Sequence, residues 1–290
     1  MRPLEGIIPA LLTGFDRGED LDPGSIRELA SRLVAEGVHG LFLCGTSGEF
    51  PLLSLEERER IVELVCDEAA GQVAIIVHVG AARTRDAIRL AQHAARLGAD
   101  AVSSVPPLYY EHRRDTLLGY IAEVAGSTPL PFLYYHIPGR TGVDIDPQFV
   151  EKMAGIPGVA GMKFSKADLS TWAAFRERAG SRFLMFCGTD EILYQALTAG
   201  AAGGIGSTYN FLPELNVNLW KAFTEGRLLE AAAVQATALE IILPLSAFPG
   251  IAASKEAVRH RFGIDLGQPR SPQDRLRPGE AEAIARALGV

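Results

Sequence analysis

The chain has 290 residues, of which 48% are hydrophobic and 22% charged, and its formal net charge is −7. This composition is typical of a soluble protein with a large core, and a negative charge without a basic run argues against binding of nucleic acid or an anionic membrane. No apolar stretch approaches the roughly 20 residues that a membrane helix needs, and the N-terminus lacks the pattern of a signal peptide. The three scattered cysteines fit reduced packing residues, so we expect a cytoplasmic protein.

One unit recurs along the chain: an apolar strand, a polar loop, an amphipathic helix and a glycine that precedes the next strand. The expected strands are Gly6–Leu12, Val38–Cys44, Val73–Val79, Ala101–Val105, Phe132–Ile137, Val159–Phe164, Phe183–Cys187 and Gly203–Ser207. They begin roughly 20 to 35 residues apart, as in the alternating β and α units of a parallel sheet. Their continuously apolar runs indicate strands that are covered on both faces.

The starts of the helices carry capping signals. Asp22-Pro23 and Asp146-Pro147 each place a capping acceptor before a proline at the first helical position, and Ser54 to Glu57 forms a capping box. Eight strand–helix units close most simply as an α/β (β/α)8 barrel, the TIM-barrel architecture. A doubly wound sheet is the alternative, which the lack of a glycine-rich dinucleotide loop after the first strand disfavours.

The strands stop near Pro213, and only helices are expected beyond it. These helices span Leu215–Phe223, Leu228–Leu243, Ala252–Phe262 and Glu280–Leu288. We assign the first helix to the barrel and the others to a small helical extension. Because no low-complexity linker separates the two parts, we expect residues 1–225 to form the barrel and residues 226–290 to pack closely on it.

Lys163 is the one charged residue within the apolar stretch Val159–Ser165. An unpaired ammonium in an apolar strand is costly, and loss of its proton is the cheapest relief. A neutral amine is a nucleophile toward ketones, so Lys163 is a candidate for Schiff-base formation. The alternative is a structural lysine that reaches water or a carboxylate near the end of the strand.

In a barrel of this kind the chemistry lies at the carboxyl ends of the strands and in the loops that follow them. After the second strand comes the turn Gly45-Thr46-Ser47-Gly48-Glu49, whose glycines and hydroxyls suit a small carboxylate. The alternative is a tight turn whose hydroxyls cap the next helix. The turn is not a nucleophile elbow, because Glu49 stands where that motif needs glycine.

Aromatic and basic residues follow the fourth and fifth strands. Tyr109 and Tyr110 come after the fourth strand, and Tyr135-His136 ends the fifth. Tyrosines at a barrel mouth can relay protons, but they are also ordinary interface residues. Strand alternation places Tyr135 and His136 on opposite faces. Arg140 lies near the mouth and could hold a carboxylate, or it could be a surface ion-pair partner.

The loops after the seventh and eighth strands add further polar groups. Gly188-Thr189-Asp190-Glu191 follows the seventh strand, and Gly206-Ser207 ends the eighth. The glycines permit close approach of a ligand, and the acidic residues and Ser207 could bind hydroxyl groups. As an alternative, Asp190 could serve only as the N-cap of the next helix.

The sequence contains few patterns that are typical of metal ligands. The six histidines show no H-x-H or H-E-x-x-H spacing, and the cysteines form no C-x-x-C pair. We therefore expect no metal site, and a metal-dependent aldolase is disfavoured.

Taken together, the strand-end motifs resemble those of the dihydrodipicolinate synthase/N-acetylneuraminate lyase family over nearly the whole chain. The turn Gly45–Glu49, the segment Tyr135…Pro138…Gly142 and Lys163 occur in that family's order and spacing. The resemblance implies a pyruvate-handling class I aldolase without a separate cofactor, in which Lys163 forms the Schiff base with pyruvate and Tyr135 shuttles protons.

The resemblance also implies roles for the other residues of the site. Thr46 and Ser47, with nearby N–H groups such as that of Gly48, would hold the pyruvate carboxylate. Tyr109 matches the family's loop tyrosine, with Tyr110 as the one-residue alternative, and in the family this residue completes the site of a neighbouring subunit. A homotetramer built as a dimer of dimers is the implied assembly.

Subgroup details are similar to the N-acetylneuraminate lyases, in which a matching glycine, acid pair and serine contact the sugar hydroxyls. The expected substrate-binding residues are Ser47, Gly48, Arg140, Ser165, Gly188, Asp190, Glu191, Gly206 and Ser207. One residue departs from that subgroup: Arg140 stands where dihydrodipicolinate synthases carry the arginine that grips the carboxylate of their aldehyde substrate.

The expected function is therefore cleavage or formation of the carbon–carbon bond between pyruvate and an aldehyde. The first choice of aldehyde is a polyhydroxylated sugar, as in N-acetylneuraminate lyase. One alternative is aspartate semialdehyde, as in dihydrodipicolinate synthase. Another is the aldehyde that cleavage of a shorter 2-keto-3-deoxy sugar acid would release. Outside the enzymes, the alternative is a barrel that binds a keto acid without turnover.

Overall fold

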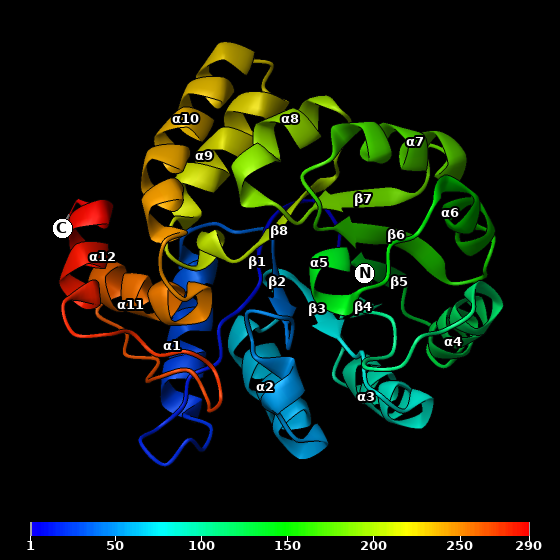
Figure 1. Ribbon diagram of the computed structural model, residues 1–290, viewed down its shortest axis with the longest axis horizontal. Helices are drawn as coiled ribbons and strands as arrows, with labels where there is room; N and C mark the ends of the chain where they lie inside the picture. The colour runs from blue at the N-terminus through cyan, green and yellow to red at the C-terminus, as the bar shows by residue number, and fades with distance from the viewer. Residues whose placement is uncertain (1, 290) are drawn as a thin grey trace.

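Eight parallel strands alternate with helices around a central ring in the computed structural model, which describes residues 2–289 (Figure 1). The strands are β1 (Gly6–Pro9), β2 (Gly40–Leu43), β3 (Ala74–His78), β4 (Ala101–Ser104), β5 (Phe132–His136), β6 (Val159–Phe164), β7 (Leu184–Cys187) and β8 (Gly203–Gly206). All eight predicted strands are confirmed. Two end where predicted, five end one residue earlier, and β1 ends three residues earlier, at Pro9 instead of Leu12.

The order of the strands in the sheet is β1-β8-β7-β6-β5-β4-β3-β2. Backbone bonds also join the two ends of this order: the His39 N–H donates to the Ile7 carbonyl at 2.8 Å, and the Leu11 N–H donates to the Phe42 carbonyl at 2.9 Å. The sheet therefore closes on itself, and the predicted TIM barrel is confirmed.

Helices cover the outside of the ring. They are α1 (Pro23–Ala35), α2 (Leu55–Ala69), α3 (Thr84–Arg96), α4 (Arg114–Gly126), α6 (Pro147–Ala154), α7 (Leu169–Ala179), α8 (Leu193–Thr198) and α9 (Pro213–Thr224), with the short α5 (Pro138–Thr141) after β5. The predicted caps are confirmed: the side chains of Asp22 and Asp146 accept bonds from the first turns of α1 and α6, and Ser54 and Glu57 form the capping box of α2.

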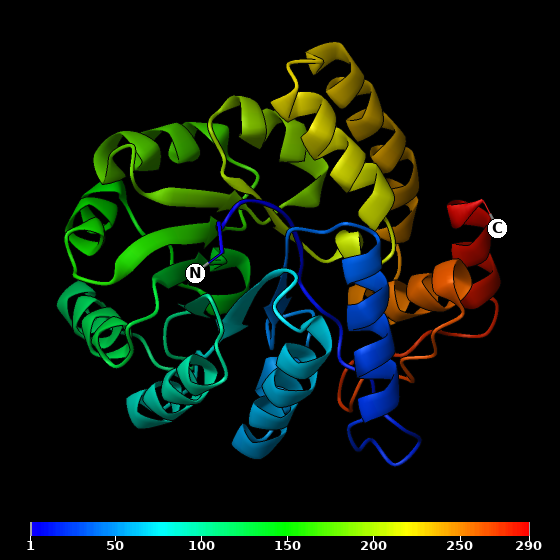
Figure 2. The same cartoon turned by 180° about the vertical axis from the view of Figure 1, so that it is seen from behind.

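Strand alternation divides the core into two layers. Residues such as Phe42, Ile76 and Tyr135 fill the inside of the barrel, whereas Phe164 and Trp172 belong to the layer between strands and helices. The short α5 lies in front of the ring in Figure 1, whereas the N-terminal segment lies in front when the molecule is seen from behind in Figure 2. The mouth formed by the loops after the strands therefore faces the viewer of Figure 1.

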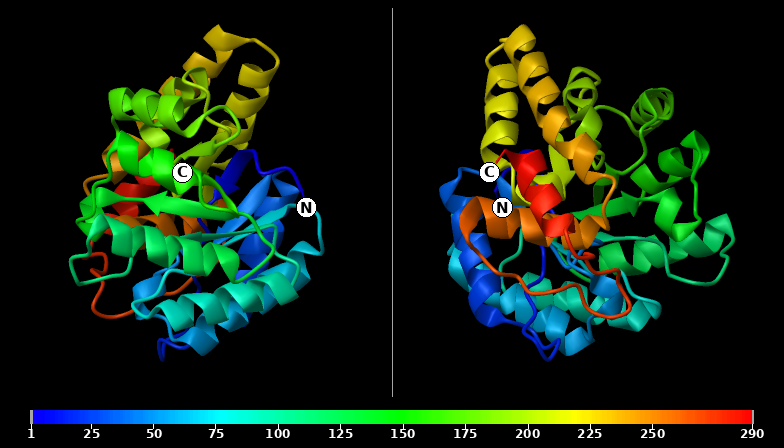
Figure 3. Two further views of the ribbon diagram at one scale, coloured as in Figure 1. Left: turned by 90° about the vertical axis from the view of Figure 1, so that its right-hand side faces the viewer. Right: turned by 60° about the vertical axis from the view of Figure 1, so that its left-hand side comes forward.

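Three helices follow the barrel: α10 (Leu228–Leu245), α11 (Gly250–Phe262) and α12 (Glu280–Leu288). The helix α10 packs along α9, α12 packs against α11 and α10, and α11 lies beside α1 (Figures 1 and 3). The Arg32 guanidinium of α1 lies 4.7 Å from the centroid of the Phe262 ring at the end of α11. The extension therefore packs on the first and last helices of the barrel, α1 and α9.

One expectation about membrane spans needs correction. Within residues 2–289, α10 is the one helix that is long and apolar enough to cross a membrane by length and composition, with a mean hydropathy of 1.6 over 18 residues. It was missed because Glu230, Gln235 and Glu240 interrupt the apolar run and the helix continues past Leu243 to Leu245. A single such helix is a weak indication of a membrane span, and α10 buries one face against α9.

Candidate active site

Lys163 projects into the barrel from the penultimate position of β6. Its side chain is 4% exposed, and its Nζ lies 4.3 Å from the centroid of the Tyr135 ring and 4.8 Å from that of Phe42. The next residue, Phe164, points outward and packs edge-on against Trp172 and Phe175. Because side chains alternate along a strand, this outward anchor fixes Lys163 on the inner face.

The surroundings of the Lys163 amine are aromatic. In the part of the chain that the structure describes, lysine ion pairs are formed by Lys166 and Lys255 but not by Lys163. The alternative of a structural lysine sealed in an ion pair is therefore not what the structure shows. The amine is left available as a nucleophile in a water-poor ring of strands.

Tyr135 connects this lysine to the turn after β2. Tyr135 and Lys163 are register partners across the β5–β6 ladder, and the Tyr135 hydroxyl lies 3.2 Å from the Thr46 Oγ1. Its ring also packs edge-on against Phe42, with centroids 5.8 Å apart. Amine, phenol and threonine hydroxyl thus form a contiguous set that can bind a carbonyl group and move a proton.

The turn Gly45–Glu49 is closed by its own backbone. The Glu49 N–H donates to the Thr46 carbonyl at 3.0 Å, and the Thr13 hydroxyl donates to the Gly48 carbonyl at 2.8 Å. Among the described residues, the N–H groups of Thr46, Ser47 and Gly48 find no acceptor. Backbone N–H groups without an acceptor, beside two hydroxyls, can form a nest for an anion.

The alternative role of this turn as a helix cap is not supported. The next α-helix, α2, begins at Leu55 and is capped by Ser54. The intervening 3-10 turn, Phe50–Leu52, has no side-chain cap. The hydroxyls of Thr46 and Ser47 are therefore not used as helix caps, and that of Thr46 lies against the Tyr135 hydroxyl.

Ser165 and Gly188 lie directly beside the lysine. A Cβ added at Gly188 would come within 2.0 Å of the Ser165 Oγ and 3.0 Å of the Lys163 Cε. The Ser165 hydroxyl is buried and has no partner within residues 2–289. Only glycine at position 188 leaves the room that the lysine and serine side chains occupy.

Asp190 lies at the junction of the seventh and eighth strand ends. Its Oδ2 accepts bonds from the Thr208 N–H at 2.9 Å and from the Thr208 hydroxyl at 2.6 Å, so it does not cap its own helix, and the N-cap alternative is wrong. A Cβ at Gly206 would come within 1.9 Å of its Oδ1. Burial raises the pKa of Asp190 above its ordinary range, although the bonds from Thr208 oppose this. Glu191 is half-buried beside it.

Two predicted residues are held apart from this set. Arg140 is exposed on α5 near the mouth, and it forms no ion pair among the residues described. Tyr109 is 94% exposed at a φ of +81°, and its ring packs edge-on against that of the exposed Tyr110. The structure of one chain therefore brings together Lys163 and Tyr135 but leaves the loop tyrosines facing solvent.

Sequence reasoning missed His78, which is buried inside the barrel with its ring edge-on to that of Tyr135, at 5.9 Å between centroids. Its Nδ1 lies 2.9 Å from the Cys44 carbonyl, and its Nε2 accepts the Val105 N–H at 3.3 Å, so the ring is neutral with its proton on Nδ1. Burial lowers the pKa of His78 well below its ordinary value. The signal was present, because His78 shares the inward parity of Ile76 on β3.

Among residues 2–289, no group of three or more His, Cys, Asp or Glu side chains is placed to hold a metal ion. Burial raises the pKa of the Cys44 thiol to about 11 and of the Cys187 thiol to about 12. Both thiols therefore stay protonated as packing groups near neutral pH.

Comparison with known proteins gives a consistent result. The sequence model of the family described as "Dihydrodipicolinate synthetase family" matches residues 3–289. A DapA-like lyase of Halobacterium salinarum, itself described as uncharacterized, is 38% identical over 285 residues, which cover 98% of this chain and 93% of the relative. The N-acetylneuraminate lyase of Rhizobium meliloti is 34% identical over 288 residues, which cover 98% and 94%.

A solved structure agrees with these relatives. YagE of Escherichia coli K12, described as a prophage protein of the dihydrodipicolinic acid synthase family and solved in complex with pyruvate, superposes with a TM-score of 0.94 at 29% identity. The superposition covers 99% of this chain and 98% of YagE. The α10 segment is therefore a helix of the shared fold.

Proposed function

Because the chain belongs to the dihydrodipicolinate synthetase family, we propose that it joins or splits pyruvate and an aldehyde through a Schiff base on Lys163. The chain is a lyase, a pyruvate-dependent class I aldolase, and the alternative of a binding barrel without turnover is set aside with that membership. The observation that carries the assignment of residues is the buried Lys163 amine against the Tyr135 ring, with the Tyr135 hydroxyl 3.2 Å from Thr46.

The chemistry follows from this arrangement. The Lys163 amine adds to the ketone carbon of pyruvate or, in the cleavage direction, of the longer 2-keto acid, and loss of water leaves a protonated imine that can accept an electron pair. In the cleavage direction, Tyr135 takes the proton from the hydroxyl group on the carbon that becomes the aldehyde. The carbon–carbon bond then breaks, the aldehyde leaves, and its bonding electrons form the enamine of pyruvate. Protonation of that carbon and hydrolysis of the imine release pyruvate and restore Lys163.

The turn after β2 is the proposed holder of the pyruvate carboxylate. It offers the hydroxyls of Thr46 and Ser47 together with backbone N–H groups that have no other acceptor among the described residues. The same turn contacts Tyr135 through Thr46. An anion held there would orient the ketone toward Lys163 and the phenol.

For the aldehyde, we propose first a polyhydroxylated sugar, in the manner of an N-acetylneuraminate lyase. Asp190, Glu191, Ser207 and Gly206 lie where the ends of β7 and β8 meet, and carboxylate and hydroxyl oxygens accept and donate bonds to sugar hydroxyls. The similarity to the Rhizobium meliloti lyase supports this choice.

The second candidate is condensation of pyruvate with aspartate semialdehyde, as in dihydrodipicolinate synthase. Arg140 favours it, because this exposed guanidinium has no ion-pair partner among the described residues and could bind a carboxylate through two parallel hydrogen bonds. Cleavage of a 2-keto-3-deoxy sugar acid would use both Arg140 and the acid pair.

Borohydride trapping tests the proposal. The purified protein is incubated with pyruvate and borohydride, and mass spectrometry of its peptides should place one reduced pyruvate adduct on Lys163. A Lys163→Met variant should gain no adduct. A wild-type protein that stays unmodified, or a variant that is still trapped, would overturn the assignment. Turnover of N-acetylneuraminate, aspartate semialdehyde and 2-keto-3-deoxy sugar acids then identifies the aldehyde.

Assembly and location remain predictions. The exposed ring of Tyr109 suits contact with a second copy, which fits a homotetramer, and sedimentation velocity of wild-type protein and a Tyr109→Ala variant would test it. A cytoplasmic location is proposed as well. The division into a barrel of residues 1–225 and an extension of residues 226–290 stays a prediction, and its outer bounds, Met1 and Val290, lie outside the described residues.

A further inference from the structure

Glu49, the last residue of the turn after β2, is held in an unusual state. Its backbone lies in the left-handed region, at φ +60° and ψ +31°, which costs free energy for any residue other than glycine. Its side chain is fully buried. A conformation of this kind persists only where the surrounding structure holds it in place.

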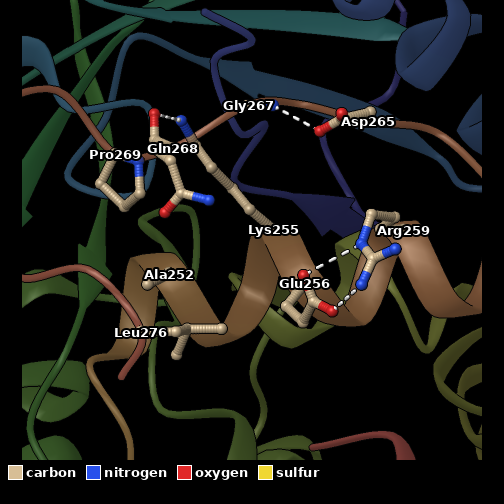
Figure 4. A pocket seen from close by; sticks show the side chains of 9 residues that line it. All are labelled: Ala252, Lys255, Glu256, Arg259, Asp265, Gly267, Gln268, Pro269 and Leu276. Carbon is tan, nitrogen blue, oxygen red and sulfur yellow. Dashed lines mark hydrogen bonds and ion pairs between the residues drawn. The ribbon is translucent and has the colours of Figure 1, made fainter. Parts of the chain in front are cut away.

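The C-terminal extension supplies the contacts that hold Glu49. The Nζ of Lys255, on α11, lies 2.9 Å from the Glu49 Oε1, and the Arg270 N–H donates to the Glu49 Oε2 at 2.9 Å. Lys255 is itself only 3% exposed, and its Nζ also donates to the Gln268 carbonyl at 3.2 Å (Figure 4). A carboxylate and an ammonium have thus been taken out of water together.

Arg270 also makes contacts with the segment that follows the turn, from Leu52 to Glu57. Its guanidinium forms a bidentate pair with Glu57 in the first turn of α2, at 2.6 and 2.9 Å, and donates to the Leu52 carbonyl at 2.8 Å. The guanidinium carbon and the Lys255 Nζ both lie over the Phe15 ring, at 4.4 and 4.5 Å from its centroid. The extension therefore fixes the segment between Glu49 and Glu57 at several points.

We propose that Glu49 and Lys255 are positioning residues for the reaction: their buried ion pair ties the C-terminal extension to the turn that receives the pyruvate carboxylate and sets the affinity for pyruvate. The inference rests on the proposed function, because it requires that turn to hold the carboxylate. Neither side chain belongs to the set around Lys163, so the pair acts through the placement of Thr46, Ser47 and Gly48.

Only a substrate with a carboxylate uses the turn, so loss of the ion pair should weaken pyruvate and spare its methyl ester, which keeps the ketone but lacks the anion. The variants Lys255→Met and Glu49→Gln remove one charge each with little change of shape. The double variant removes both charges, and it carries the same test if a single variant with an unpaired buried charge fails to fold.

The experiment measures the ketone concentration that gives half-maximal borohydride trapping. For pyruvate we expect a rise of about 10- to 100-fold in the variants, with kcat at saturating pyruvate nearly unchanged. For methyl pyruvate we expect a change of less than about twofold. Lys255→Arg should bind pyruvate much more nearly like wild type than Lys255→Met does, because arginine keeps the positive charge. Lys255 borders a cavity of about 250 Å³, which gives the larger arginine side chain room. Arg259→Met, on the same helix but in an exposed pair with Glu256, is the matched control.

The outcomes separate the two proposals. If wild-type protein is trapped by pyruvate but the variants keep the wild-type half-saturation, the positioning role is overturned and the Schiff-base function stands. An equal weakening of pyruvate and methyl pyruvate would also overturn it, because general loss of structure does not distinguish the two ketones. A wild-type protein that pyruvate does not trap overturns both proposals.

Discussion

Lys163 and Tyr135 are register partners on β6 and β5, and the lysine Nζ lies 4.3 Å from the centroid of the tyrosine ring. Paired residues of neighbouring strands project from the same face of a sheet, so the ladder itself brings the amine and the phenol together. The pair lies on two hydrogen-bonded strands of the barrel, whereas the turn of Thr46 reaches it from a loop.

Tyr135→Phe should separate imine formation from turnover. The variant keeps the ring that packs on Lys163 and Phe42 but loses the hydroxyl that moves the proton. We expect borohydride trapping of pyruvate to persist and kcat to fall by about 10²- to 10⁴-fold. Steady-state kinetics and mass spectrometry on the same preparation measure the two effects.

Tyr134→Phe is the matched control for that variant. Tyr134 lies one residue away but faces the outer layer, and its buried hydroxyl has no partner among the described residues. Loss of an unpaired hydroxyl should leave kcat within roughly twofold of wild type. Equal kcat losses in the two variants would contradict a proton-transfer role for Tyr135.

Gly188→Ala should damage the site by overpacking. Its new methyl group would collide with the Ser165 Oγ at 2.0 Å and crowd the Lys163 Cε at 3.0 Å. We expect a loss of about 1–3 kcal/mol in unfolding free energy and a fall in kcat/KM of about 10- to 100-fold. Urea unfolding and steady-state kinetics measure the two quantities.

Gly119→Ala is the control for a methyl group at a harmless place. Gly119 lies in α4, and its added Cβ would meet no atom within 4 Å. Alanine in a helix is about 0.5–1 kcal/mol more favourable than glycine, so this variant should be stabilised and fully active. A Gly188→Ala protein with unchanged kinetics would show that Lys163 has more room than the structure indicates.

Arg140→Ala should discriminate between the candidate aldehydes. A charge-assisted bond to a substrate carboxylate contributes about 1.5–3 kcal/mol, so KM for aspartate semialdehyde should rise about 10- to 100-fold if Arg140 holds that group. KM for N-acetylmannosamine, which has no carboxylate, should stay within about twofold. An unchanged KM for the acid aldehyde would remove Arg140 from the site.

A suitable control removes an exposed arginine from the other end of the barrel. Arg182 is exposed just before β7, at the amino ends of the strands and away from the mouth. Arg182→Ala should leave both KM values unchanged. A shift as large as that of Arg140→Ala would mean that net charge, rather than a specific contact, sets the KM.

The buried His136 should make the fold sensitive to mild acid. Burial lowers the pKa of His136 from 6.5 to about 4, and Asp144, at 3.3 Å from Nε2, opposes this only in part. Between these two values the unfolded chain binds a proton that the folded chain does not bind. The unfolding free energy therefore falls as the pH falls through this window, by at most about 3 kcal/mol.

Urea unfolding at pH 7 and pH 4.5 measures this loss, with His136→Gln as the comparison. The variant lacks the group and should lose less stability between the two pH values. His78 is buried as well and contributes in both proteins, so only the difference between them reports on His136. The same pH dependence in both proteins would contradict a buried neutral His136.

The pattern of the strands was predictable because it is local. A strand covered on both faces needs a continuous apolar run, and side-chain alternation assigns each residue to a face. The same alternation correctly separated Tyr135 from His136, and the polar residue in the apolar run of β6 marked Lys163. The caps at Asp22, Ser54 and Asp146 involve bonds over two or three residues, so they too were readable from the chain.

Other features depended on contacts between segments that are far apart in the chain. The N-cap role considered for Asp190 was wrong because closure of the barrel brings Thr208 to its carboxylate. The need for glycine at position 188 follows from Ser165 on the neighbouring strand end. Neither contact leaves a signal in the spacing of residues.

The sequence by itself determined the barrel, its helix caps and the buried lysine near the end of the sixth strand. These features depend on burial patterns and hydrogen bonds between residues that are close together in the sequence. Only the tertiary structure decided that Glu49 lies against Lys255 and Arg270 and that the Tyr109 side chain points into solvent. Such pairings are selected by the packing of the C-terminal helices on the closed ring, where two buried charges must find each other or pay the cost of desolvation.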